Sequence, residues 1–89
     1  MANSAYLVAG VRSPIGGFGG SLMPLRATEV ASQVGAALLE RHGIRPDAIE
    51  RVIGGMVLQD MTESNPARIV AKRLGIPDRV PDFTINMQC

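Results

Sequence analysis

Strand-type segments alternate with helical segments along this chain, and this alternation is the feature that most constrains its fold. Residues 5–11 (AYLVAGV) form a continuous apolar run, which is typical of a strand buried on both faces. A second apolar run spans residues 51–58, and residues 83–88 alternate apolar and polar side chains after a proline. Strands that alternate with helices favour right-handed crossovers, a parallel sheet and an α/β fold.

The first predicted helix lies between the first two strand segments. Thr28 is a suitable N-cap, and Glu29 adds negative charge to the first turn. We expect the helix to run to about His42, with Gly43 as the residue beyond its cap. Its apolar face is predicted to comprise Val30, Val34, Ala37 and Leu38.

The second predicted helix begins at Asn65-Pro66, with asparagine as the N-cap and proline in the first helical position, and ends at Gly75. A short helical turn is expected over residues 46–49. Gly54-Gly55 weakens the middle strand and indicates a close approach by another part of the chain. The apolar face of this helix is predicted to comprise Ala67, Val70, Ala71 and Leu74.

The chain is short for a self-sufficient α/β domain. Its 46% apolar content excludes wholesale disorder. However, 89 residues bury only about 60% of their unfolded surface, and two helices cannot cover both faces of a parallel sheet. The last strand also ends at the last residue, where the chemistry of an α/β fold usually begins. We therefore expect the fold to be incomplete on its own.

Composition excludes several classes of function. A net charge of +1 without a basic run argues against nucleic-acid binding. One cysteine and one histidine exclude an internal disulfide and a cysteine-rich metal cluster, so no metal is expected. No apolar stretch approaches 18 residues and no secretory signal begins the chain, which predicts a cytoplasmic protein without a membrane segment.

Cys89 is the candidate nucleophile. A cysteine that follows a strand and precedes a helix has a lowered thiol pKa, because the helix N–H groups stabilise the thiolate. The alternative is an inert thiol, and residue type and position alone favour it, since a single cysteine is weak evidence.

Other residues have simpler interpretations. Arg68 could bind an anion, but an exposed or ion-paired arginine at a helix start is favoured, and His42 is expected only to complement the helix dipole. The run Gly16–Gly20 is interpreted as a turning loop, because no helix or Lys-Ser/Thr follows it as in a phosphate loop. The three methionines that could line a soft binding surface, or fill a core or interface, are Met56, Met61 and Met87.

Four motifs, in order, resemble the thiolase family. Residues 11–20 (VRSPIGGFGG) are similar to the R-T-P-I-G-x-F-G-G signature, with Ser13 in place of the usual threonine. Residues 54–59 (GGMVLQ) resemble G-x-V-L-Q, and residues 65–68 (NPAR) resemble the N-P-A-R helix start. Residues 84–89 (TINMQC) resemble the strand that ends in the thiolase nucleophile.

The resemblance implies a fold and an activity. Residues 1–89 would be the first part of a thiolase N-terminal domain, β-α-β-α-β up to the nucleophile, within a five-layered αβαβα fold. On this resemblance, the rest of that domain and the whole C-terminal domain would be absent from this chain. The implied activity is that of an acyl-CoA acyltransferase, which performs reversible Claisen condensation or thiolytic cleavage of 3-oxoacyl-CoA. Cys89 would take the acyl group as a thioester, with the coenzyme A thioester as substrate and no separate cofactor.

The family also needs an activating histidine, a second cysteine and an oxyanion hole, which this chain lacks. The resemblance therefore implies a companion chain with the rest of the fold, in a hetero- or homo-oligomer, and leaves the CoA-binding residues unassigned. Two alternatives stay open. One is a biosynthetic condensing enzyme of the thiolase fold that uses carrier-bound acyl groups, and the other is a thiolase-derived structural or regulatory chain without catalysis.

Overall fold

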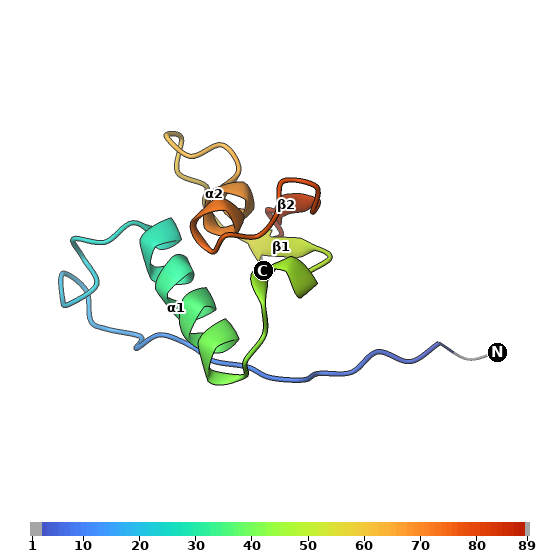
Figure 1. Cartoon of the computed structure of the whole chain (residues 1–89). Coiled ribbons are helices and arrows are strands. Elements are labelled where there is room, and N and C mark those ends of the chain that lie inside the picture. The colour runs from blue at the N-terminus through green and yellow to red at the C-terminus, as the bar shows by residue number, and fades with distance from the viewer. Residues whose placement is uncertain (1–2, 89) are drawn as a thin grey trace.

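The computed structural model of this protein describes residues 3–88. Two helices and two short strands alternate along the chain, and a long extended segment precedes them (Figure 1). The elements are helix α1 (Ala27–Arg41), the 3₁₀ turn η1 (Pro46–Ala48), strand β1 (Val52–Gly55), helix α2 (Pro66–Arg73) and strand β2 (Asp82–Ile85).

The two strands form a parallel pair, as the alternation of strands and helices predicts. Val52 pairs with Asp82 and Gly55 with Ile85, so the two strands begin and end in register. Helix α2 packs against both strands, and α1 packs against α2. The sheet face that α2 covers carries the half-buried Asp82 and Thr84, while the alternate residues point to the open face. The period-two pattern is confirmed up to Ile85, where the polar residues of β2 face the helix. Residues 86–88, which we expected in the same strand, lie beyond its end and are exposed.

The first predicted strand is wrong in this structure. Residues 5–11 are extended but form no strand, so the order is α-β-α-β, and the sheet has two strands where we expected three. Tyr6 and Leu7 are almost fully exposed, at 83% and 102%. A buried-type strand is stable only when its backbone groups have a neighbouring strand and its side chains are covered. The described residues 3–88 give this segment no strand partner, and within it only Ala9 and Val11 are half-buried.

The positions of the helix ends are confirmed, but the residue that caps the start of α1 is not the predicted one. Gly43 and Gly75 adopt positive φ angles of 61° and 75° after α1 and α2, as terminating glycines do. Thr28, however, is not the N-cap of α1. Arg26 occupies that position and makes no capping hydrogen bond, while Thr28 lies inside the first turn. The Thr28 hydroxyl instead donates a hydrogen bond to the side chain of Glu63.

The buried core is small. Among residues 3–88, Ala71, Ile76 and Val80 form its central cluster, and the half-buried Ile49, Val52 and Leu74 pack against it. The accessible surface is 6980 Å², whereas about 5,000 Å² is expected of a compact folded monomer of this mass. The radius of gyration, 14.2 Å, likewise exceeds the roughly 12 Å of a compact domain of this length.

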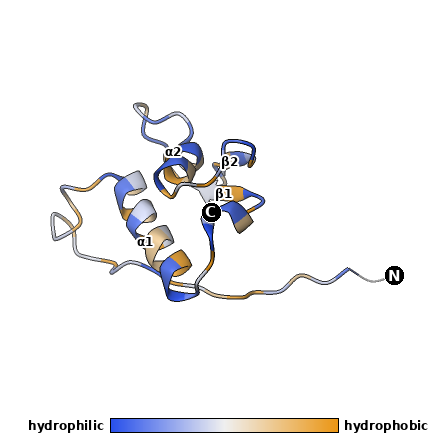
Figure 2. Ribbon diagram, viewed as in Figure 1, coloured by the Kyte–Doolittle hydropathy of each residue, from blue (hydrophilic) through white to orange (hydrophobic). Residues whose placement is uncertain are grey.

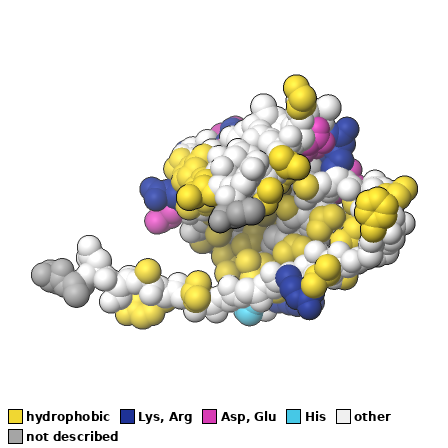
Figure 3. Space-filling model, turned by 180° about the vertical axis from the view of Figure 1, so that it is seen from behind, with side chains coloured by type: hydrophobic (Ala, Val, Ile, Leu, Met, Phe, Trp, Pro, Cys, Tyr) yellow, Lys and Arg dark blue, Asp and Glu magenta, His cyan; other side chains and the backbone are white. Residues whose placement is uncertain are grey.

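Many large apolar side chains are exposed. Figure 2 shows hydrophobic residues along the extended N-terminal segment as well as on the helices, and Figure 3 shows hydrophobic side chains gathered in a hollow beside that segment. On the open face of the sheet, Ile53, Phe83 and Ile85 remain 57%, 41% and 37% exposed. Apolar patches of this kind mark surfaces that other polypeptide covers. We use the term assembled protein for this chain together with the polypeptide that we expect to cover this face.

In the described part of the chain, neither helix has the length and apolar character required to cross a membrane.

Candidate functional site

The carboxyl ends of β1 and β2 form the candidate site. Because the strands are parallel and in register, the residues that follow Gly55 and Ile85 emerge at the same edge of the sheet. That edge is where α/β folds place their ligands and catalytic groups. Three residues, Asn86, Met87 and Gln88, separate the end of β2 from Cys89.

Hydrogen bonds continue between the two chain segments beyond the strands. The backbone N–H of Met56 donates to the Ile85 carbonyl at 3.0 Å. The Asn86 side-chain amide then donates to the Met56 carbonyl at 3.4 Å, and the Gln88 amide donates to the Val57 carbonyl at 2.8 Å. The segment that leads to Cys89 is therefore held against the segment that follows β1. Cys89 itself lies outside the described residues.

The start of α2 is joined to β2 by side chains. The Thr84 hydroxyl donates to Asn65 Oδ1 at 2.7 Å and accepts from the Ala67 backbone N–H at 3.1 Å. Asn65 is the N-cap residue, as predicted, but its side chain makes no capping bond, and Thr84 binds a free N–H of the first turn in its place. The helix start is thus fixed to the strand that leads to the candidate site.

Arg68 forms an ion pair and does not offer a free anion site. Its Nη1 lies 2.9 Å from Asp82 Oδ2, and its Nη2 lies 3.5 Å from Asp78 Oδ1. The hydrogen bond to Asp82, reinforced by that carboxylate's charge, raises the pKa of the Arg68 guanidinium. The ion-paired interpretation is confirmed, and the bond ties α2 to the beginning of β2.

A polar network holds the loop between β1 and α2 against the start of α1. Arg26 Nη1 donates to the Thr62 hydroxyl at 2.6 Å and lies 3.4 Å from both Asp60 Oδ2 and Glu63 Oε1. The Thr62 hydroxyl and backbone N–H also donate to Asp60 Oδ1, at 2.7 and 2.8 Å. Within the same loop, the Gln59 amide donates to the Glu63 and Ser64 carbonyls.

Thr28 and Glu63 are the buried centre of this network. Thr28 is 1% exposed and Glu63 is 9% exposed. The Thr28 hydroxyl donates to Glu63 Oε1 at 3.1 Å and accepts from Arg73 Nη1 at 3.3 Å, so one hydroxyl joins α1, α2 and the loop before α2. A buried carboxylate needs such partners, because an unpaired charge in the interior is very unfavourable.

Removing the Thr28 hydroxyl should destabilise the assembled protein. Thr28→Val keeps the shape but leaves the buried Glu63 without its hydroxyl donor, so we expect a loss of about 1–3 kcal/mol in the free energy of unfolding. Denaturant unfolding measures it. Thr62→Val makes the same chemical change at an exposed position, where water replaces the lost bonds, and should cost less than about 1 kcal/mol. Equal effects of the two variants would contradict the buried role.

Asp60 gives the assembled protein a specific acid sensitivity. Hydrogen bonds from the Thr62 side chain and backbone, with the Arg26 charge as a smaller cause, hold the Asp60 pKa below its usual 3.8. Its stabilisation is therefore present above about pH 4 and is lost as the pH falls through the lowered pKa. We expect Asp60→Asn to make stability fall less steeply below pH 4, as followed by unfolding at a series of pH values. Parallel curves for the two proteins would show that this carboxylate has no such role.

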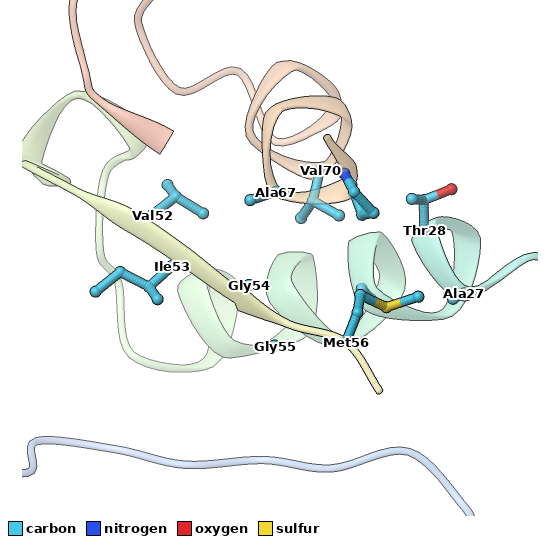
Figure 4. Close-up of a pocket in the computed structure, with 11 residues that line it drawn as sticks. Ala27, Thr28, Val52, Ile53, Gly54, Gly55, Met56, Ala67 and Val70 are labelled. Carbon is cyan, nitrogen blue, oxygen red and sulfur yellow. The ribbon is translucent and has the colours of Figure 1, made fainter. Parts of the chain in front are cut away.

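An apolar pocket of about 200 Å³ lies between α1, β1 and α2 (Figure 4). Thr28 is its only side chain with a hydroxyl, and that hydroxyl is bonded to Glu63 and Arg73. A Cβ atom at Gly54 would lie 3.2 Å from the Ala67 Cβ, which confirms the close approach that the glycine pair indicated. No charged or catalytic side chain lines the pocket, so it suits apolar packing. Its lining residues are Ala27, Thr28, Ala31, Val52, Ile53, Gly54, Gly55, Met56, Pro66, Ala67 and Val70.

The other candidates lie away from the carboxyl edge or are exposed. His42 is the exposed C-cap residue of α1 and leads into the connection that reaches the amino end of β1. In the glycine run, Gly16 and Gly19 adopt positive φ angles, which fits the turning loop that we predicted. Met61 and Met87 are 99% and 81% exposed, so these two fill no core among the described residues.

Sequence reasoning missed the buried pair Thr28–Glu63 and the amide bond from Gln88. Thirty-five positions separate Thr28 from Glu63, and no local spacing signals such a contact. In the sequence, Gln88 is one of the polar residues of the alternating segment 83–88, and nothing there indicates its partner. The resemblance of residues 54–59 and 84–89 to two motifs of one family was the single signal that these segments belong together.

Comparison with known proteins gives the same family over the whole chain. Residues 5–89 match the model of the thiolase N-terminal domain. The chain is 42% identical over 89 residues to an acetyl-CoA acetyltransferase of Thiocystis violacea and 40% identical over 83 residues to a probable acetyl-CoA acyltransferase of Staphylococcus aureus. It covers 100% and 93% of its own length in these matches, but only 23% and 21% of the relatives.

A solved structure supports the fold. The crystal structure of the Bacillus anthracis acetyl-CoA acetyltransferase superposes with a TM-score of 0.78 at 41% identity, over 85% of this chain and 19% of that one. The chain thus spans about a fifth of the length of the proteins that it matches, and its small sheet is an incomplete part of their fold. The family model covers nearly the whole chain, and the parallel strands β1 and β2 fit that fold. The chain therefore belongs to the thiolase family and lies within its N-terminal domain.

Proposed function

We propose that this chain supplies the cysteine nucleophile, Cys89, of an acyl-CoA acyltransferase that performs reversible Claisen condensation or thiolytic cleavage of 3-oxoacyl-CoA. The observation that carries the proposal is the match of all 89 residues, at 42% identity, to an acetyl-CoA acetyltransferase, with three residues between the end of β2 and Cys89. Residues 1–89 are then the first part of the thiolase N-terminal domain.

The reaction at Cys89 is an exchange of thioesters. The Cys89 thiolate attacks the carbonyl carbon of the acyl-CoA, a new carbon–sulfur bond forms, and the bond between that carbon and the CoA sulfur breaks. CoA leaves with the electron pair and takes up the proton that Cys89 has released. One thioester replaces another, so the step is nearly balanced in energy, and the difficult condensation is divided into two easier steps.

The proposed chemistry needs groups from further thiolase polypeptide. A general base must lie within hydrogen-bonding reach of the thiol, and His42, the only histidine, lies before the amino end of β1 and not at its carboxyl end. The proposed partner is therefore the polypeptide that carries the rest of the thiolase fold, with the base and a second cysteine. The open sheet face at Ile53, Phe83 and Ile85 supports such a partner, because it is apolar and uncovered.

Mass spectrometry of the assembled protein after exposure to acetyl-CoA tests the proposal. We expect Cys89 to gain one acetyl group, and an excess of CoA to remove it. Faster labelling by a carrier-protein thioester than by acetyl-CoA would instead indicate a biosynthetic condensing enzyme. Absence of labelling by either donor, in an assembly that is folded and complete, would leave a structural or regulatory role and contradict the proposal.

A further inference from the structure

The last described residues before Cys89 are held by side chains and not by the sheet. Backbone pairing of β1 with β2 ends at Gly55 and Ile85, and one more backbone bond joins Met56 to Ile85. Beyond that point, the two bonds between the segments come from the amides of Asn86 and Gln88. The Gln88 bond, at 2.8 Å, is the shorter of the two and the nearer to Cys89 in sequence.

The acceptor of the Gln88 amide lies on a loop whose far end is anchored. Val57 is the second residue of the loop that follows β1, and Gln59 closes this loop on itself through the Glu63 and Ser64 carbonyls. The buried Glu63 side chain is held by Thr28 and Arg26 of the α1 start. The Val57 carbonyl therefore belongs to a loop that is fixed to the helical layer.

We propose that Gln88 is a positioning residue, whose amide holds the chain at the nucleophile by binding the Val57 carbonyl. This inference rests on the proposed role of Cys89. Consecutive Cα atoms are about 3.8 Å apart, so a restraint on residue 88 limits where the Cys89 Cα can lie. The backbone hydrogen bonds between the two segments end at Ile85 in the described structure, so they do not restrain residue 88.

The Gln88 hydrogen bond should affect the rate of acylation and not the stability of the protein. The Gln88 side chain is exposed, and an exposed hydrogen bond adds little to global stability, because water replaces it when it breaks. The attack of a thiolate on a thioester, by contrast, requires near-attack geometry, and a misplacement of about 1 Å can lower a rate by about 10²-fold. Loss of the amide should therefore slow the acylation of Cys89 without unfolding the protein.

Gln88→Met in the assembled protein is the test, since methionine has a similar length but no donor. We expect the rate constant for acylation by acetyl-CoA to fall about tenfold, with KM unchanged, one acyl group per Cys89 at completion, and an unchanged melting temperature. Gln33→Met makes the same change on the exposed surface of α1 and should leave the rate as it is.

Gln88→Asn gives a second measurement that keeps the amide. Its side chain is about 1.5 Å shorter, so the amide no longer reaches the Val57 carbonyl, and the rate should fall as in Gln88→Met. Wild-type rates in both variants would overturn the positioning role while leaving the nucleophile assignment in place. A reduced number of acylated sites with an unchanged rate per site would show a merely structural role and overturn it too. An unlabelled wild-type protein would overturn the proposed function itself.

Discussion

In the assembled protein, replacing Cys89 with alanine should lower turnover by at least about 10⁴-fold and abolish acyl labelling. The variant has no nucleophile, so the two-step route through a thioester is closed, and losses of this size are typical when a nucleophile is removed. Steady-state turnover with acetoacetyl-CoA and CoA measures the first effect. Mass analysis after acetyl-CoA exposure measures the second.

His42→Ala is the matched control for this prediction. His42 is the only histidine of the chain, but it is an exposed C-cap residue that precedes the amino end of β1. We expect its removal to change turnover by less than about twofold, since the base must lie within hydrogen-bonding reach of the thiol. If Cys89→Ala keeps its labelling and turnover, the nucleophile is another residue. If His42→Ala abolishes turnover, the base lies in this chain.

The isolated chain should show no cooperative unfolding transition as a monomer. Its central core contains three buried side chains, and its accessible surface exceeds that of a compact monomer of its mass by about 2,000 Å². At about 25 cal/mol per Å² of apolar surface, the burial that is missing exceeds the net stability of a small domain. We expect a gradual loss of helical signal with denaturant and association at high concentration.

Circular dichroism in a denaturant series, with sedimentation to determine mass, checks this expectation. Addition of the rest of the thiolase fold should restore a single sharp transition, because the open sheet face then becomes buried. Ile53→Asp is a useful variant, since this side chain is 57% exposed in the chain alone and points to the open face. It should weaken the assembly and leave the isolated chain unchanged. A sharp monomeric transition of the isolated chain would contradict the prediction.

Local sequence chemistry predicted the helices and the parallel pair well. Glycine is favoured where φ must be positive, so Gly43 and Gly75 marked the two helix ends correctly. Proline at the first helical position located the start of α2. Each of these signals acts within a few residues of the backbone that it controls, and tertiary contacts are not needed to interpret them.

The prediction failed where a segment depends on distant partners. Residues 5–11 have a strong strand composition, but composition only says that the segment suits a covered sheet position. In the described structure no strand pairs with it, and it remains extended and largely exposed. The prediction that Thr28 is an N-cap is wrong for a similar reason. Its hydroxyl binds Glu63 and Arg73, which are distant in the sequence, and not the backbone of its own helix.

The sequence by itself determined the alternation of helices and strands, the family, and Cys89 as the proposed nucleophile, because periodicity, terminating residues and ordered motifs are local properties. Only the tertiary structure decided that Arg68 pairs with Asp82, that Glu63 is buried on Thr28, and that Gln88 binds Val57. Fourteen to thirty-five positions separate the partners of these contacts. Which donor meets which acceptor over such separations depends on how the helices pack on the sheet, since no pattern along the chain encodes the distance between two side chains.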